Sequence, residues 1–259
     1  MATKTTPLAD PALILVVDDD DFFREGVVSF LRRNDLTTLE AADAESAYAL
    51  AVQHRPGAAV VDIMLPERPD TPARRDQNQG IDLVRRLKRA DPTLAVVVLS
   101  AFGDRSEALL RLALEGVRGV AYLVKGCPAR LLLQGLEEAR AGHIMIKTTD
   151  PGEMAELAEK LWSHLTPPER EYVRRAVELF PMLTEREQAV ALELAHAQTV
   201  EGVAVALNIA VTTAEKHIHH LYAKLGLDEA DQQQPPLRKS LLLAKACWLL
   251  DMLGYGQAG

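Results

Sequence analysis

Acidic, hydroxyl and basic side chains follow several short apolar runs of the sequence, each at the point where the run ends. Four consecutive aspartates, Asp18 to Asp21, end the first run, Asp62 ends a later one, and Ser100 and Lys125 end two more. Clustered carboxylates repel one another unless a cation neutralises them, and a set of oxygen ligands suits Mg²⁺. A carboxylate can also be a nucleophile that forms an acyl phosphate. These residue types predict magnesium-dependent phosphoryl chemistry, with the hydroxyl and the ammonium binding phosphoryl oxygens.

Each of these residues also has an ordinary structural explanation. A run of aspartates is often a solvated helix start, where negative charge is favourable near the helix dipole. A single Asp, Ser or Lys after a strand is usually a loop residue. The chemical interpretation therefore depends on elements that bring all of these residues to one place.

The first half of the chain alternates between strand-like and helix-like segments. The apolar runs 14–17, 58–61, 94–99 and 120–124, with a weaker one at 37–40, predict strands; the stretches 22–33, 44–54, 81–89, 105–115 and 129–141 predict helices. Five such units predict an α/β doubly wound (βα)5 domain over residues 12–141, with no further strand after Gly142. Its chemistry would lie at the carboxyl ends of the strands.

The second half is predicted to be all-helical. Residues 142–182 read as a helical linker of two helices interrupted by Pro167-Pro168, which could dock on a domain or pair between subunits. Residues 183–259 form a further domain that begins with a Thr184–Glu187 capping box. A short helix over 200–207, a turn and a longer helix over 212–225 have the spacing of a helix-turn-helix. In such modules the last helix enters the major groove of DNA.

Composition excludes several classes of protein. The 259 residues are 48% hydrophobic and 25% charged, which is typical of a globular chain. Two cysteines cannot build a disulfide scaffold, so we expect a cytoplasmic location. No long apolar span or signal-peptide pattern occurs, so we expect no membrane partner. The GxSxG, Walker A and HExxH motifs are absent, and the only reactions expected are self-phosphorylation and autodephosphorylation at Asp62.

Residues 12–141 resemble the receiver domain of two-component response regulators. The resemblance rests on Leu15-Val16-Val17-Asp18-Asp19, Val61-Asp62-Ile63-Met64-Leu65-Pro66, Leu99-Ser100-Ala101 and Tyr122-Leu123-Val124-Lys125. It implies that Asp62 is the phosphoacceptor and that a sensor histidine kinase is the phosphoryl donor. The other implied roles are Mg²⁺ binding by Asp18, Asp19, Asp62 and the Met64 carbonyl, phosphoryl contact by Ser100 and Lys125, and switching by Ser100 and Tyr122.

Two features depart from this family's pattern. The segment 67–79, beside Asp62, is longer than the family's usual loop and is either a tolerated insertion or a lid that selects a partner. Met64 and Phe102 stand where some relatives carry polar side chains that orient an attacking water. Apolar groups there predict slow loss of the phosphoryl group.

Residues 183–253 resemble the LuxR/NarL-type (GerE-like) output domain. The matching residues run from Leu183-Thr184 through Thr212-Thr213-Ala214-Glu215-Lys216-His217 to Leu221-Tyr222-Ala223-Lys224-Leu225-Gly226. The resemblance implies a transcription regulator that binds double-stranded DNA, and a homodimer when active, formed through the last helix near 237–253. The implied DNA-binding residues are Thr212, Thr213, Lys216, His217, His220 and Lys224.

The charge of the output domain leaves an alternative open. Residues 183–259 contain six Lys/Arg and nine Asp/Glu, a net charge of −3, whereas duplex binding relies on several cations. Glu201 and Glu215 stand where family members often have lysine. The alternative is a response regulator whose helical domain binds a protein partner. His219 and His220 could belong to a solvated face, and a metal site there lacks a fitting carboxylate and cysteine set.

Overall fold

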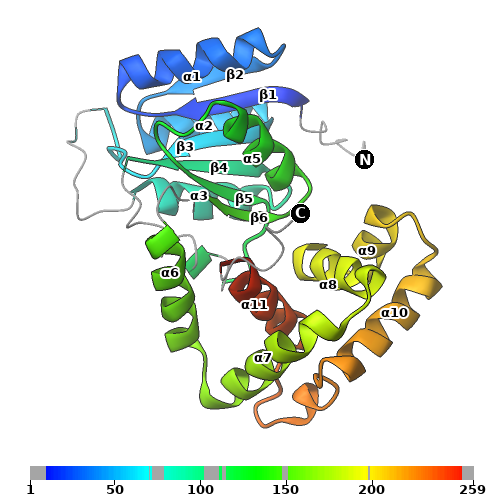
Figure 1. Cartoon of the computed structure of the whole chain (residues 1–259). Coiled ribbons are helices and arrows are strands. Elements are labelled where there is room, and N and C mark those ends of the chain that lie inside the picture. Colours follow the sequence, from blue (N-terminus) through cyan, green and yellow to red (C-terminus); the bar gives the residue numbers. More distant parts are fainter. Residues whose placement is uncertain are drawn as a thin grey trace, which may run out of the picture. The chain divides into compact units, whose positions relative to one another are not determined.

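The computed structural model describes residues 10–69, 71, 79–101, 111–112, 115–147, 151–197 and 199–252. The contacts of the chain divide it into two compact units, residues 1–150 and residues 151–259 (Figure 1). Over the ranges just given, no helix is both long enough and apolar enough to cross a membrane.

Unit 1 is built on a parallel sheet with strand order β2-β1-β3-β4-β5-β6. The strands are β1 (Asp10–Val17), β2 (Thr37–Ala41), β3 (Pro56–Asp62), β4 (Ala95–Ser100), β5 (Val120–Val124) and β6 (Ile144–Lys147). All six residues of β4 are buried, because a central parallel strand is covered on both faces. This confirms the predicted doubly wound α/β fold.

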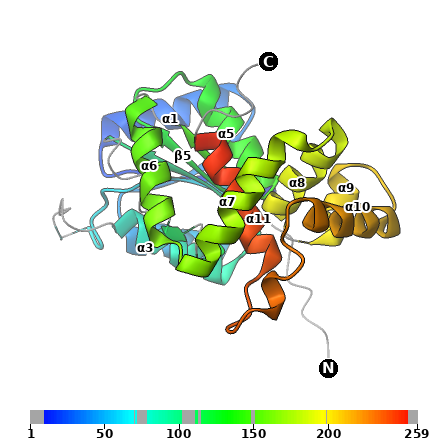
Figure 2. The same ribbon diagram turned by 60° about the horizontal axis from the view of Figure 1, so that its bottom comes forward.

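Helices cover both faces of this sheet. They are α1 (Asp21–Arg33), α2 (Ala44–His54), α3 (Gln79–Ala90) and α5 (Arg130–Arg140). Figure 2 shows α1 and α5 on one side of the strands and α3 on the other. The core beneath α1 and α5 includes Ile14, Leu31, Val60, Val97 and Leu136. Of the helix predicted over 105–115, only Arg111, Leu112 and Glu115 lie within the described residues.

The prediction that the strands end at Gly142 is wrong. Gly142 adopts a φ of 83° after α5, a conformation that glycine takes without a steric penalty. The chain then turns back, and β6 adds to the sheet beside β5, with Tyr122 opposite Ile146. Met145 and Ile146 are buried, so this short segment contributes to the core of unit 1 and not to a helical linker.

Unit 2 is helical, with its last helix in the centre. Its elements are α6 (Pro151–His164), α7 (Pro167–Leu179), η2 (Phe180–Met182), α8 (Glu185–Ala197), α9 (Val200–Ala206), α10 (Val211–Lys224), η3 (Ala230–Gln232) and α11 (Lys239–Met252). α11 packs against α6, α7 and α8, and nearly every residue from Leu242 to Met252 is buried. The two helices predicted within 142–182 therefore pack against the last helix of their own unit.

Proline and threonine set the start of α7. Thr166 is the N-cap, Pro167 and Pro168 occupy the first turn, and Glu169 completes a capping box. Proline suits this position because the first helical N–H groups have no partner within the helix. A second capping box joins Thr184 and Glu187 at the start of α8, as predicted: the Glu187 carboxylate accepts hydrogen bonds from the Thr184 backbone N–H and hydroxyl at 2.9 and 3.0 Å.

Candidate functional site

Three aspartates and a lysine meet at the carboxyl edge of the sheet in unit 1. The Lys125 Nζ atom lies 2.7 Å from Asp18 Oδ2 and 2.9 Å from Asp62 Oδ2. One carboxylate oxygen from each of Asp18, Asp19 and Asp62 lies within 4.8 Å of the other two. Asp18 and Asp62 are buried and Asp19 is exposed. The site is therefore a small acidic pocket, open at Asp19.

Burial controls the ionisation of this pocket. Burial is the largest of the causes that raise the pKa of Asp18 to about 6; the hydrogen bond from Lys125 opposes it, and repulsion from Asp62 adds to it. The pKa of Asp19 is raised in the same way, first by burial and then by Asp62. Burial alone would lower the pKa of Lys125, but its hydrogen bonds and charge interactions with Asp18 and Asp62 raise it. The lysine therefore stays charged. Its single positive charge does not balance the three carboxylates of Asp18, Asp19 and Asp62.

The other aspartates of the run 18–21 have structural roles. Asp20 is the N-cap of α1, and its Oδ1 accepts hydrogen bonds from the Phe22 and Phe23 N–H groups at 3.0 and 3.1 Å. Asp21 lies in the first turn of the same helix and pairs with Arg24. The helix-start explanation thus applies to Asp20 and Asp21, while Asp18 and Asp19 face the pocket.

Backbone contacts hold the strand ends that carry these side chains. The Lys125 N–H donates to the Ser100 carbonyl at 2.7 Å, which ties β5 to β4 beside the pocket. The Gly80 N–H donates to the Ile63 carbonyl at 3.0 Å. A Cβ atom on Gly80 would lie only 1.9 Å from the Asp62 carbonyl oxygen, so α3 can start here only with a glycine.

Of the other residues predicted for this site, the structure describes Ser100, Tyr122 and Met64. Ser100 ends β4 and is buried, and the side chain of Tyr122 is fully buried in β5. Met64 is half-buried, two residues after Asp62. Phe102 and most of the segment 67–79 lie outside the described residues. The roles expected for them therefore remain predictions.

Sequence reasoning missed one aromatic contact and the close approach of Gly80. The ring centroid of Phe23, at the start of α1, lies 4.4 Å from Lys125 Nζ, within the range of a cation–π contact. Phe23 is thus a third neighbour of the lysine beside the two carboxylates. Neither contact leaves a signal in the sequence, because each joins segments far apart in the chain.

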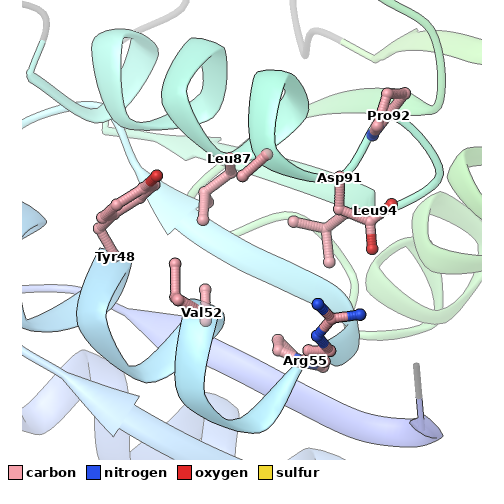
Figure 3. A pocket seen from close by; sticks show the side chains of 10 residues that line it. Tyr48, Val52, Arg55, Leu87, Asp91, Pro92 and Leu94 are labelled. Carbon is pink, nitrogen blue, oxygen red and sulfur yellow. The ribbon is translucent and has the colours of Figure 1, made fainter. Parts of the chain in front are cut away.

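A separate pocket of about 540 Å³ lies between α2 and α3, near the amino-terminal end of β3. Figure 3 shows Tyr48, Val52 and Arg55 of the α2 segment on one side and Leu87, Asp91 and Leu94 on the other. It lies at the opposite edge of the sheet from Asp62, since Pro56 begins β3 and Asp62 ends it. It therefore takes no part in the acidic pocket.

In unit 2, α9 and α10 pack together as the helix-turn-helix that the spacing predicted. Ala214, Ile218 and Leu221 are the buried face of α10. Of the predicted DNA-binding residues, Thr212, Lys216, His220 and Lys224 are exposed, whereas Thr213 and His217 are half-buried. The exposed face also carries Val211, Glu215 and His219, which the prediction left out. Among the described residues, these histidines do not form a metal-binding cluster.

Lys224 is already paired within the unit. Its Nζ lies 2.6 Å from Glu187 Oε1 on α8, so the ammonium joins the end of α10 to the capping box of α8. The hydrogen bond from Lys224 is the largest of the causes that lower the pKa of Glu187 to about 2. Lys216, the other lysine predicted to contact DNA, is exposed on α10. It makes no ion pair with any residue that the structure describes.

Comparisons with known proteins match both units. Residues 14–137 match the model of the response regulator receiver domain, and residues 181–232 match that of the bacterial regulatory proteins of the luxR family. The response regulator protein VraR of Staphylococcus aureus strain NCTC 8325 / PS 47 is 24% identical over 221 residues, which cover 85% of this chain and 92% of that protein.

Two solved structures are also similar to this chain. A complex of the response regulator RcsB with DNA is 18% identical, with a TM-score of 0.46, and the similarity covers 95% of this chain and 100% of that one. A LuxR-family response regulator from Aurantimonas sp. SI85-9A1 is 25% identical, with a TM-score of 0.44, and the similarity covers 58% of this chain and 98% of the other.

Proposed function

The chain is a two-component response regulator, with a receiver domain followed by a luxR-type domain, and we propose that Asp62 is the residue through which it is controlled. It is a phosphorylation-controlled transcription regulator. The finer proposal is that a sensor histidine kinase transfers a phosphoryl group to Asp62 and that the α9–α10 helix-turn-helix binds double-stranded DNA. The observation that carries the phosphoryl-transfer part is the Asp18–Lys125–Asp62 contact at the carboxyl edge of the sheet, and the DNA-binding part is supported by the luxR-family match.

The donor set of the pocket fits Mg²⁺. Asp18, Asp19 and Asp62 bring carboxylate oxygens within reach of one ion, and the Met64 carbonyl would add a fourth oxygen. Hard cations of this kind bind oxygen ligands. When bound, Mg²⁺ would offset the negative charge of the transferring phosphoryl group. The raised pKa values of Asp18 and Asp19 support this assignment, because a nearby cation would favour their ionised forms.

The chain's own residues then perform the transfer. An Asp62 carboxylate oxygen forms the new P–O bond as the P–N bond to the kinase histidine breaks. Lys125, 2.9 Å from Asp62 Oδ2, would bind a phosphoryl oxygen as a charge-assisted donor. The Phe23 ring also contacts the Lys125 ammonium and would help to hold it beside Asp62. No other side chain needs to move a proton.

The switch that follows would use Ser100 and Tyr122. Ser100 ends β4, and its carbonyl accepts a hydrogen bond from the Lys125 N–H; its hydroxyl would bind a phosphoryl oxygen on Asp62. Tyr122 is buried on β5, three residues before Lys125. A hydrogen bond from the Ser100 hydroxyl to the phosphoryl group would shift the population of conformations at the carboxyl edge of the sheet. The conformation favoured in this way would promote a homodimer.

Phosphate incorporation tests the assignment of Asp62. With a small-molecule phosphoryl donor and Mg²⁺, we expect the wild type to take up one phosphate that alkali and hydroxylamine release, as for an acyl phosphate, and Asp62→Asn to take up none. Asp20→Asn is the matched control, because it changes an aspartate two residues from Asp18 that caps α1, and asparagine caps equally well. Equal incorporation in Asp62→Asn would show that another residue is the acceptor.

DNA enrichment tests the output function. We expect the chain to enrich particular fragments from pooled genomic DNA at low salt, more strongly with beryllofluoride and Mg²⁺, and less strongly in Lys216→Ala. The net charge of −3 over residues 183–259 favours the second candidate, in which α9 and α10 bind a protein. Absence of enrichment in both states would support that candidate, whereas the luxR-family match supports DNA.

A further inference from the structure

The exposed face of α10 carries an acidic and an apolar residue where base edges would lie. Val211, Glu215 and His219 are spaced at i, i+4 and i+8, and all three are exposed, so they form one stripe along the helix. The buried stripe of Ala214, Ile218 and Leu221 faces the rest of unit 2. Val211 and Glu215 lie in the first two turns of the helix, the part that contacts bases in helix-turn-helix modules.

Glu215 differs from the glutamates that have structural roles in this unit. Glu187 pairs with Lys224 and caps α8, and Glu169 pairs with Lys245 and caps α7. Glu215 makes no hydrogen bond or ion pair with any residue in the part of the chain that the structure describes. A free carboxylate on this face lowers the affinity for the phosphate backbone, and none of the described residues of the unit pairs with it to offset that cost.

The chemistry of the major groove offers a partner for each side chain. A carboxylate only accepts hydrogen bonds, and acidic side chains accept from the N4 amino group of cytosine. A valine has neither donor nor acceptor, but it can pack on the 5-methyl group of thymine. Side chains at i and i+4 are about 6 Å apart, and successive bases on a strand rise by about 3.4 Å. The two bases would therefore be one or two steps apart.

Building on the proposed DNA-binding function, we propose that Glu215 and Val211 are specificity-determining residues of α10. Glu215 selects a cytosine through its N4 amino group, and Val211 selects a nearby thymine through its methyl group. Any base that presents only acceptors to Glu215 leaves the carboxylate unpaired, so the same residue that weakens general binding increases discrimination between sequences. Lys216 supplies the neighbouring cationic contact on the same helix.

A selection from random duplexes tests the role of Glu215. With the full chain, beryllofluoride and Mg²⁺, we expect the wild type to enrich cytosine at one position by about tenfold over other bases, as for a good base contact. Glu215→Gln should lose that preference and gain one for adenine, whose N6 and N7 suit an amide. Glu201→Gln is the matched control: Glu201 is exposed on α9, off the α10 face, so its loss should raise affinity for all sequences without changing the selected base.

A second measurement tests Val211 without relying on Glu215. Replacing thymine by uracil in the selected site removes only the methyl group. We expect the wild type to bind the uracil site about fourfold more weakly, from the loss of one buried methyl contact. Val211→Ala should bind the two sites nearly equally.

The outcomes separate this inference from the function on which it rests. If the wild type and Glu215→Gln select the same base, with affinities that differ by one common factor, the carboxylate only repels DNA and the inference is wrong while DNA binding stands. A wild-type preference that uracil substitution leaves unchanged would likewise remove the role of Val211. If neither the wild type nor Glu201→Gln enriches any sequence, both the inference and the proposed DNA binding are wrong.

Discussion

At the scale of single residues, the pocket depends on a contact that involves no side chain. The first turn of α3 lies directly on the backbone of Asp62, with Gly80 at the point of closest approach. Lys125 and Asp18 can reach Asp62 only while that backbone keeps its position. A residue that takes no part in the chemistry therefore limits the geometry of the proposed phosphoacceptor.

Gly80→Ala tests this dependence. A Cβ at 1.9 Å from the Asp62 carbonyl oxygen cannot be accommodated without moving the backbone, and we expect a loss of about 1–3 kcal/mol in stability together with slower phosphate incorporation. The measurements are urea unfolding followed by circular dichroism and the rate of phosphorylation by a small-molecule donor. Gly26→Ala is the control, since a Cβ on Gly26 in α1 would contact nothing within 4 Å. Normal phosphorylation of Gly80→Ala would contradict this account.

At the scale of secondary-structure elements, paired charges fasten the helices of unit 2 to one another. Glu187 both caps α8 and holds Lys224 at the end of α10. Glu169 caps α7 and holds Lys245 of α11 at 2.5 Å. Each glutamate therefore joins two helices as well as completing a capping box.

The Glu187 pair makes the stability of unit 2 depend on pH. The pKa of Glu187 is lowered to about 2 from its ordinary value of about 4.5, so the pair stabilises the folded state above pH 4.5 and this contribution is lost as the pH falls toward 2. Because the pair is partly exposed, we expect about 1 kcal/mol or less. Urea unfolding read by the fluorescence of Trp162 and Trp248 would measure it. Glu187→Gln should flatten this part of the pH profile, since glutamine keeps the capping box.

Lys245 tests the buried contact between α7 and α11. Lys245→Met keeps most of the apolar stem but leaves Glu169 without its cation, and we expect the free energy of unfolding to fall by about 3 kcal/mol. Glu156→Gln, which removes the exposed pair with Lys160 at 3.1 Å, should change it by less than about 1 kcal/mol. Equal effects of the two variants on the urea midpoint would show that burial adds nothing to the Lys245 pair.

The sequence predicted those features that depend on local patterns. Apolar runs predicted β1 to β5. Because the carboxyl ends of parallel strands meet at one edge of the sheet, the sequence also predicted that Asp18, Asp62 and Lys125 lie together. β6 was missed because a run of only four residues shortly after a glycine gives a weak pattern. The Lys224–Glu187 pair was missed because its members are 37 residues apart, and only the packing of α8 against α10 brings them together.

At the scale of the whole molecule, the chain consists of two units whose cores are built differently. In unit 1 the strands from β3 to β6 lie side by side in the order of the sequence, while β1 lies between β2 and β3. The core of unit 2 surrounds α11, the last helix, which contacts α6, α7 and α8. As packed here, α11 is covered by α6 and α7, so a homodimer through the last helix would require those helices to move away.

Two fragments test where the second unit begins. We expect residues 151–259 to fold alone, with helical circular dichroism and one cooperative urea transition, because all three helices that cover α11 are present. Residues 183–259, which start at the predicted domain boundary, lack α6 and α7 and leave one side of α11 exposed, so we expect them to aggregate or to unfold at lower urea. Equal stability of the two fragments would show that α6 and α7 are dispensable for the output domain.

The central position of α11 has a consequence for synthesis on the ribosome. Unit 1 is complete once residue 147 has emerged, whereas unit 2 cannot close its core until the final helix is made, on the order of ten seconds later at typical elongation rates. During that interval the faces of α7 and α8 that α11 covers in the finished chain have no such cover. We therefore expect a chain terminated before residue 239 to retain a folded receiver domain, to lack the core of unit 2, and to produce no transcriptional response.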